Sequence, residues 1–281
     1  MVDKLKSFET RTSFATGDVA SINGMLQSGS LSVIWSLLEI QDYFNVTGDI
    51  VEIGVHQGKL FLLLCHWLNR EETAYAIDIF GRPVGSDTQN IDALIDNLQR
   101  FNIPEDQYRL EIRDSLNLTR SSLRGLLGGT GVRLFSVDGD HCKKAVLHDL
   151  VIAESALSSE GVIIADDLFN VWYPNVTEAV YDFFRDPAVR DLVPIAFISA
   201  NGPVETGAAK LLIARAGMAA KYKAGLKLLN QDDLKHCDPF ADHPDVPHFY
   251  FAESPKKRAL DETLRGILDE ICGGFARETY C

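Results

Sequence analysis

The sequence has few cysteines, and their spacing organises neither a disulfide framework nor a metal site. Its 281 residues contain five cysteines, all far apart and without a C-x-x-C pair. This pattern argues against small disulfide-stapled folds and zinc ribbons, and it favours a reducing environment.

A long apolar segment is also missing. The longest apolar run, residues 60–68, is about half the length of a membrane span. The N-terminus lacks the apolar stretch of a signal peptide. We therefore expect a soluble, cytoplasmic protein with no membrane partner.

Positive charge is scarce. Lys and Arg number 27 against 40 Asp and Glu, which gives a formal net charge of -13. A field of that sign repels phosphate backbones, so we expect no nucleic-acid partner.

What the sequence does contain is a regular alternation of short β-rich apolar runs with helical patterns. The expected strands are residues 50–55, 73–80, 108–114, 132–140 and 161–167, and each is followed by a helical segment. Such alternation predicts βαβ units, and strands without a polar face predict a parallel sheet covered by helices on both sides.

Two further strands close the pattern. Residues 194–201 and 208–216 are separated only by the turn-forming residues 202–207, which are too short for a crossover helix. We therefore predict an α/β fold, a three-layer Rossmann-like sandwich. Its sheet has seven mostly parallel strands and ends in an antiparallel hairpin of the sixth and seventh.

The chain is expected to form a single domain, residues 1–281. Residues 1–47 form a leader that could act as a lid and contain a helix over 32–44, and residues 48–215 form the core. Residues 216–281 form a tail with a helix over 258–272. We expect the tail to pack on the core or on a partner subunit of a homo-oligomer.

One tail segment is rich in groups that can bind metals. Its spacing matches no ligand pattern, and its prolines favour a surface loop over a zinc site. The residues are His236, Cys237, Asp238, Asp242, His243, Asp245 and His248.

In an open parallel sheet, ligands bind beyond the carboxyl ends of the strands. The first strand ends in Glu52, Gly54, His56 and Gly58, an E-x-G-x-x-x-G loop that leads into a helix. Its glycines allow a tight turn, and Glu52 places a carboxylate where a nucleotide phosphate would otherwise lie. The loop favours a cationic or zwitterionic ligand, although a purely structural turn explains the pattern about equally well.

The next two strands end in further polar groups. Asp78 lies about twenty residues beyond the glycine loop, the usual place for an acid that binds ribose hydroxyls. Asp114 and Ser115 follow the third strand and could bind an adenine amino group, or simply cap the following helix.

Titratable side chains gather after the fourth and fifth strands, namely Asp138, Asp140, His141, Asp166 and Asp167. Converging carboxylates repel one another unless a cation neutralises them, which predicts an oxygen-ligated divalent ion such as Mg²⁺. The alternative is that Asp140 and Asp167 cap helices.

Together these motifs resemble the class I S-adenosylmethionine-dependent methyltransferases, over about residues 30 to 215. More narrowly they resemble the metal-dependent sugar O-methyltransferases of the macrocin, mycinamicin and novobiocin type. The resemblance implies that Glu52, Gly54 and Gly58 hold the methionine part of the cofactor. It further implies that Asp78 binds the ribose, and that Asp114 and Ser115 lie near the adenine. This loop departs from the glycine-richer methyltransferases because it has only two glycines and carries His56, which we also expect to bind the cofactor.

The resemblance also implies a metal site and a base. The metal ligands correspond to Asp138, Asp166 and Asp167, and either Asp140 or His141 qualifies as the catalytic base, with His141 narrowly favoured. The expected function is transfer of a methyl group from S-adenosylmethionine to a hydroxyl of a small molecule or sugar, in secondary-metabolite or saccharide biosynthesis. Alternatives on the same fold are an NAD-dependent oxidoreductase, a related hydroxylase and a non-catalytic binding protein.

Overall fold

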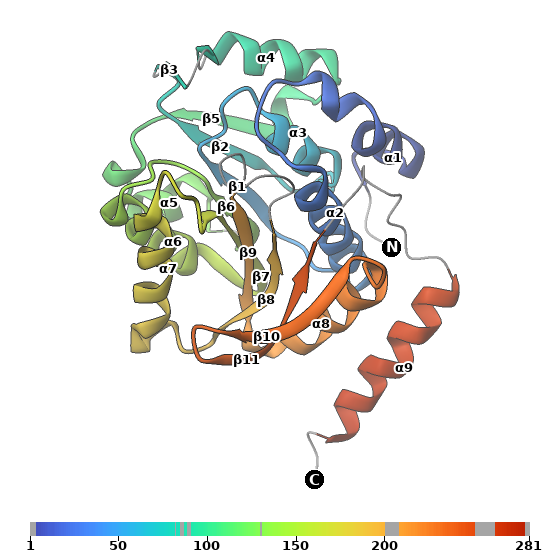
Figure 1. Cartoon of the computed structure of the whole chain (residues 1–281). Coiled ribbons are helices and arrows are strands. Elements are labelled where there is room, and N and C mark those ends of the chain that lie inside the picture. Colours follow the sequence, from blue (N-terminus) through green and yellow to red (C-terminus); the bar gives the residue numbers. More distant parts are fainter. Residues whose placement is uncertain are drawn as a thin grey trace.

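The computed structural model describes residues 4–81, 83–84, 87–88, 91–129, 131–199, 208–250 and 262–278. Its centre is a run of five parallel strands (Figure 1): β1 (Asp49–Ile53), β2 (Ala74–Asp78), β5 (Tyr108–Ile112), β6 (Val132–Val137) and β7 (Leu157–Leu168). They lie side by side in the order β5-β2-β1-β6-β7. All residues of β1, β2 and β6 are buried, because helices cover both faces. The parallel core predicted from the sequence is confirmed.

The two strands that follow reverse direction. β8 (Leu192–Ile198) and β9 (Ala209–Arg215) pair antiparallel, and β9 lies between β8 and β7, to which it is also antiparallel. The predicted antiparallel pair of sixth and seventh strands is therefore confirmed. The turn expected at residues 202–207 lies outside the described residues.

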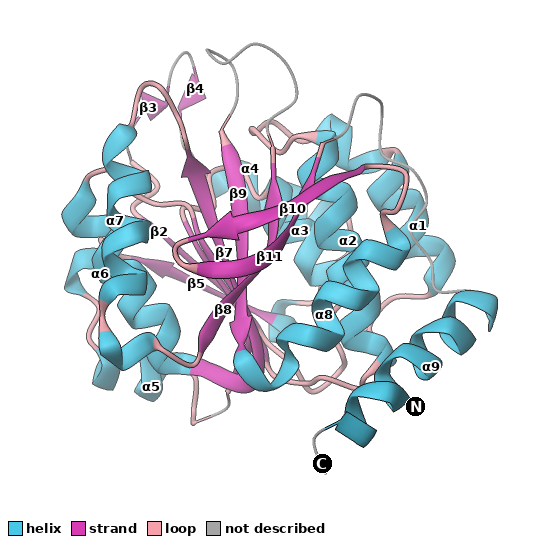
Figure 2. Cartoon of the chain, turned by 60° about the horizontal axis from the view of Figure 1, so that its bottom comes forward, coloured by secondary structure: helices cyan, strands magenta, loops and turns pink. Residues whose placement is uncertain are grey.

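Helices form a layer on each face of the sheet (Figure 2). One apolar core lies under α1 (Phe8–Thr16), α2 (Ser28–Tyr43), α3 (Lys59–His66), α4 (Ile91–Arg100) and α8 (Ala216–Leu229). A second core lies under α5 (Arg120–Leu126), α6 (Lys143–Ala156) and α7 (Pro174–Arg185). The three predicted layers are thus present. The helix expected at residues 32–44 is α2, which is buried along most of its length.

The tail adds strands that the sequence analysis did not anticipate. β10 (Leu234–Phe240) and β11 (His243–Phe249) form an antiparallel hairpin, and β11 pairs parallel with β8, so the main sheet has nine strands within the described residues. The prediction of a surface loop around residues 236–248 is therefore wrong.

Position in the sheet explains why proline is tolerated in this hairpin. β10 is an edge strand, and β11 makes only two pairings with β8, so few ladder hydrogen bonds need a proline N–H. The turn residues Ala241 and Asp242 both have positive φ, as a tight two-residue hairpin turn requires.

Two smaller features complete the chain. α9 (Glu262–Glu278) lies against α8, and a short pair is formed by β3 (Pro83–Val84) and β4 (Asp87–Thr88). Part of the helix expected over 258–272 falls outside the described residues. Among the described residues, no helix is both long and apolar enough to cross a membrane.

Candidate functional site

The predicted site residues lie at one edge of the molecule because they follow the carboxyl ends of parallel strands. β1, β2, β5, β6 and β7 run in the same direction. Their final residues therefore meet at the same side of the sheet, where ligands of open α/β sheets bind.

The loop after β1 passes very close to the loop after β6. A Cβ atom at Gly54 would lie 1.7 Å from the carbonyl oxygen of Asp138, and the φ angle of Gly54 is +85°. Only glycine fits both conditions. This glycine therefore allows the two loops to lie in contact.

Glu52 is buried at the same point, with 2% of its surface exposed. Its Oε2 atom has no hydrogen-bond partner among the described residues. Burial raises the pKa of Glu52 well above its ordinary value, the negative charges of Asp138 and Asp78 act in the same direction, and the Lys210 ammonium opposes them. A buried carboxyl with an unused oxygen suits a cationic ligand group.

Asp78 organises the neighbouring loop. Its Oδ2 accepts a hydrogen bond from the His56 backbone N–H at 3.0 Å, and its Oδ1 accepts one from Phe80 N–H at 2.9 Å. Gly58, with φ of +88°, then begins α3. The predicted residues of the first two strand ends are thus brought together in one loop pair. The His56 Nδ1 atom is buried there without a partner among the described residues.

The residues after β5 are already engaged with the protein. Asp114 caps a short 3-10 turn, because its Oδ1 accepts from Leu116 N–H. The Ser115 hydroxyl donates to Oδ2 of Asp149 at 2.9 Å, and the Ser115 carbonyl oxygen lies 3.0 Å from Nε2 of His148. Capping, the alternative weighed for this pair, is what Asp114 does here.

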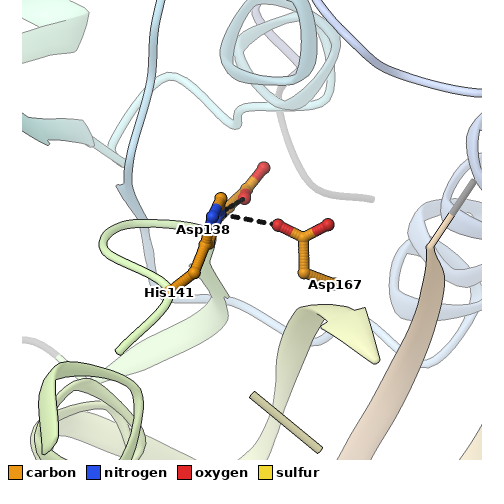
Figure 3. Close-up of side chains that lie close together, drawn as sticks. All are labelled: Asp138, His141 and Asp167. Atoms are coloured by element: carbon orange, nitrogen blue, oxygen red, sulfur yellow. Dashed lines mark ion pairs between the residues drawn. The ribbon is translucent and has the colours of Figure 1, made fainter. Parts of the chain in front are cut away.

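Three side chains converge after β6 and β7 (Figure 3). Asp138, His141 and Asp167 each offer one ligand atom, and these atoms lie within 4.8 Å of one another. Burial raises the pKa of Asp138 to about 6, with a further contribution from Asp167, whereas Lys210 and His141 oppose the rise. Two carboxylates and one imidazole form a donor set that fits a divalent cation.

His141 is held by two neighbours. Its Nε2 lies 2.7 Å from Oδ2 of Asp167, and its ring lies 4.1 Å from the ring of Tyr173, centroid to centroid. Burial lowers the pKa of His141, but the hydrogen bond and charge of Asp167 outweigh burial, so the pKa is raised. Conversely, burial alone would raise the pKa of Asp167, but His141 lowers it.

Asp166 points to a different partner. Asp166 and Asp167 lie where β7 leaves its register with β9, between Ala165 and Leu168. The Oδ2 atom of Asp166 forms an ion pair with Lys210, the second residue of β9, and its Oδ1 accepts from Asp167 N–H at 2.7 Å. Asp166 is therefore absent from the group formed by Asp138, His141 and Asp167.

The sequence analysis missed Lys210. A lysine at the start of an apolar strand was the available signal, since Lys210 lies in the otherwise apolar run AAKLLIA. Asp140, the other candidate base, accepts a hydrogen bond from Cys142 N–H at 2.8 Å through Oδ1. This bond lies within the turn that precedes α6.

Aromatic side chains border the cluster in the segment between β7 and α7. Phe169 is 52% exposed, Trp172 69% and Tyr173 44%. The ring of Phe169 packs edge-on against Phe197 of β8. An apolar surface therefore lies directly beside His141, which contacts Tyr173.

The tail residues considered for zinc do not form such a group. His236 and His248 face each other across β10 and β11, with ring centroids 4.8 Å apart. Within the described part of the chain, the hairpin brings no three of its ligand-type residues together.

A family model matches the segment of the chain that contains this site. Residues 51–168 match the family model described as a methyltransferase domain. The chain carries a methyltransferase domain. The matched segment includes every predicted site residue from Glu52 to Asp167, and it confirms the prediction of a methyltransferase. No curated protein sequence matches the chain.

Solved structures show the same fold at low sequence identity. The O-methyltransferase NovP is 16% identical with a TM-score of 0.54, covering 74% of this chain and 97% of that one. The O-methyltransferase TomG from Streptomyces achromogenes is 16% identical with a TM-score of 0.51, covering 75% of this chain and 92% of that one. An O-methyltransferase from Bacillus cereus is 15% identical with a TM-score of 0.50, covering 75% and 92%.

Proposed function

We propose that this methyltransferase transfers the methyl group of S-adenosylmethionine to a hydroxyl oxygen, with a divalent cation at the site. The observation that carries the proposal is the position of Glu52. Its buried, partly unpaired carboxyl lies close enough to Asp138 for the charge of Asp138 to raise the pKa of Glu52. A site for a cationic ligand and a site for a metal ion therefore adjoin at one sheet edge.

The cofactor would be held by the loops after β1 and β2. When bound, S-adenosylmethionine supplies an electrophilic methyl group on a positively charged sulfur. Glu52 offers a carboxylate to the positive methionine part, and burial strengthens that attraction. Asp78 offers the lone pairs left by its two backbone bonds to the ribose hydroxyls. Gly54 and Gly58 allow the backbone to approach closely. His56, whose Nδ1 is unpaired, completes this loop.

We propose that Asp114 and Ser115 contact the adenine through their backbone and not through their side chains. Their side-chain oxygens accept from Leu116 N–H and donate to Asp149, respectively. Both residues nevertheless follow β5, the strand beside β2. We therefore propose that this turn forms one wall of the adenine pocket.

The cation would be held by Asp138 and Asp167, with Mg²⁺ as the first candidate. When bound, a divalent ion supplies positive charge that stabilises an ionised acceptor hydroxyl. His141 is the proposed base. If its Nε2–H donates to Asp167, the basic atom of the neutral ring is Nδ1, and the Asp167 carboxylate stabilises the imidazolium formed when His141 takes a proton.

The acceptor would lie on the aromatic border formed by Phe169, Trp172 and Tyr173. An exposed apolar surface beside the base suits the ring of a small molecule or the face of a sugar. NovP and TomG are described as O-methyltransferases, and TomG as involved in tomaymycin synthesis. These descriptions support a small hydroxylated acceptor from secondary metabolism.

We also propose that the tail contributes to a homo-oligomer. α9 buries Leu268, but Ile267 and Ile271 on the same helix are 39% and 37% exposed. Exposed apolar side chains of this kind are common at subunit contacts. Analytical ultracentrifugation of the wild type and of Ile271→Glu tests this, and a monomeric wild type contradicts it.

A ligand panel in a thermal-shift assay tests the proposed function directly. We expect S-adenosylhomocysteine to raise the melting temperature, because a ligand that binds only the folded state stabilises it. NAD should leave the melting temperature unchanged. Stabilisation by NAD and none by S-adenosylhomocysteine would support the oxidoreductase alternative and refute the proposal.

A further inference from the structure

Lys210 is a buried cation at the centre of the acidic site. It is only 4% exposed, and its ammonium pairs with Oδ2 of Asp166. The carboxylates of Asp138 and Glu52 also lie near enough to attract it. Lysine is seldom buried to this extent without a partner, so the charge of Asp166 is what retains it here.

Each carboxylate oxygen of Asp166 has a partner within the protein. Oδ2 faces Lys210, and Oδ1 accepts from the Asp167 backbone N–H at 2.7 Å. Asp138, His141 and Asp167, by contrast, converge without Asp166. The two consecutive acids after β7 therefore have different partners.

We propose that Lys210 is a positioning residue that withholds Asp166 from the cation site, leaving Asp138 and Asp167 to hold a divalent ion beside His141. The inference rests on the proposed function and concerns only how its metal is held. The proposed site has two carboxylate ligands, and the Lys210 ammonium lies beside it. Such a site binds a divalent ion more weakly than three free carboxylates would, because affinity rises with the number of charged ligands.

Titration of the full-length protein with Mn²⁺, followed by the electron paramagnetic resonance of the free ion, tests this without an acceptor. The key variant is the double substitution Asp166→Asn with Lys210→Met, which neutralises both partners and leaves the net charge of the site unchanged. Replacing a buried ion pair as a unit is generally tolerated. We expect its Mn²⁺ affinity to stay within about threefold of wild type, whereas Asp167→Asn should weaken binding by at least about tenfold.

Lys210→Met alone provides the complementary test. It frees the Asp166 carboxylate, so we expect Mn²⁺ to bind at least about fivefold more tightly than to wild type. A purely structural role for Lys210 would give no such gain. If this single variant does not fold, the double variant still decides.

Besides the absence of a gain in Lys210→Met, two results would overturn the inference. One is a double variant that loses Mn²⁺ affinity as severely as Asp167→Asn, which would make Asp166 a ligand. The other is a wild type that binds no Mn²⁺ at millimolar concentration. Calorimetry with S-adenosylhomocysteine on the same samples separates this inference from the proposed function. Retained cofactor binding leaves the methyltransferase proposal standing, and its absence refutes that proposal whatever the Mn²⁺ result.

Discussion

His141 and Asp167 are joined by a 2.7 Å contact between Nε2 and Oδ2, although they come from different loops. Asp167 reaches this position with φ of +62°, a left-handed conformation that is uncommon for residues other than glycine. Strained residues of this kind concentrate at functional sites, where the surrounding structure holds them. The contact favours His141 over Asp140 in our proposal that one of these two residues is the base.

Replacing His141 should separate catalysis from cofactor binding. Once a screen of phenolic and sugar hydroxyls returns an acceptor, we expect His141→Ala to lower kcat by about a hundredfold or more, because a positioned base is lost. Affinity for S-adenosylhomocysteine should not change. Asp140→Asn should have a smaller effect, since an amide oxygen can still accept from Cys142 N–H.

A histidine away from the site provides the control for that experiment. His236→Ala, on the exposed face of β10, should leave turnover unchanged. Single-turnover rates should be compared, so that product release does not mask chemistry. An unaltered rate in His141→Ala would assign the proton to another group.

The proposed cofactor site predicts that replacing either of two acids weakens binding of S-adenosylmethionine. Glu52→Gln removes the buried carboxylate, and Asp78→Ala removes the group proposed to bind ribose. Because a hydrogen bond to a charged group contributes roughly 1.5 to 3 kcal/mol, we expect each variant to bind S-adenosylmethionine at least about tenfold more weakly. Calorimetry measures this, with the exposed Glu105→Gln as control. Wild-type affinity in both variants would contradict the assignment.

Two glycines should respond oppositely to alanine. Gly54→Ala places a Cβ 1.7 Å from the Asp138 carbonyl oxygen at a φ of +85°, and we expect a loss of roughly 2 to 6 kcal/mol in the free energy of unfolding. Gly125 lies in α5 with nothing within 4 Å of its Cβ position. Gly125→Ala should gain roughly 0.5 to 1 kcal/mol. Urea unfolding distinguishes the two, and equal effects would contradict the close approach of the loops.

The central fold could be predicted because its signals are local. Continuous apolar runs such as residues 132–137 indicated buried parallel strands, and a short turn between two strands indicated the β8 and β9 pair. Once the strands are parallel, topology alone places Glu52, Asp78 and Asp138 at one edge. These inferences needed no knowledge of side-chain directions.

The other features of the fold and the site could not be predicted, because they depend on contacts between residues far apart in the sequence. The pairing of Lys210 with Asp166 arises only because β9 inserts beside β7. Asp166 and Asp167 lie at a register irregularity of β7, and periodicity reveals neither this irregularity nor which of the two acids contacts His141. The tail hairpin was missed because its prolines suggested a loop, whereas an edge position tolerates them.

Asp149 is another group that only the structure reveals. It lies on α6 with no exposed surface, and its Oδ1 has no hydrogen-bond partner among the described residues. Burial raises its pKa to about 7, the charges of Asp114 and Asp140 add to the rise, and the Ser115 hydroxyl opposes it. At neutral pH and above, the fold therefore holds a carboxylate whose ionisation inside the protein is unfavourable.

The sign of the resulting pH dependence follows from this shift. An acid with a raised pKa in the folded state contributes stability at low pH. For Asp149 that contribution is lost as the pH rises from 3.8, the ordinary pKa, to about 7, the pKa in the folded protein. Asparagine cannot ionise, so Asp149→Asn should be more stable than wild type at pH 8 by roughly 2 to 4 kcal/mol, and the difference should shrink to about 1 kcal/mol or less near pH 4.5. Urea unfolding across this range measures the effect. The exposed Asp106→Asn is the matched control for replacing an aspartate by asparagine and should change the free energy of unfolding only slightly. A stabilisation of Asp149→Asn that is independent of pH would show that the carboxyl is not titrating in the folded protein, and that packing alone explains the change.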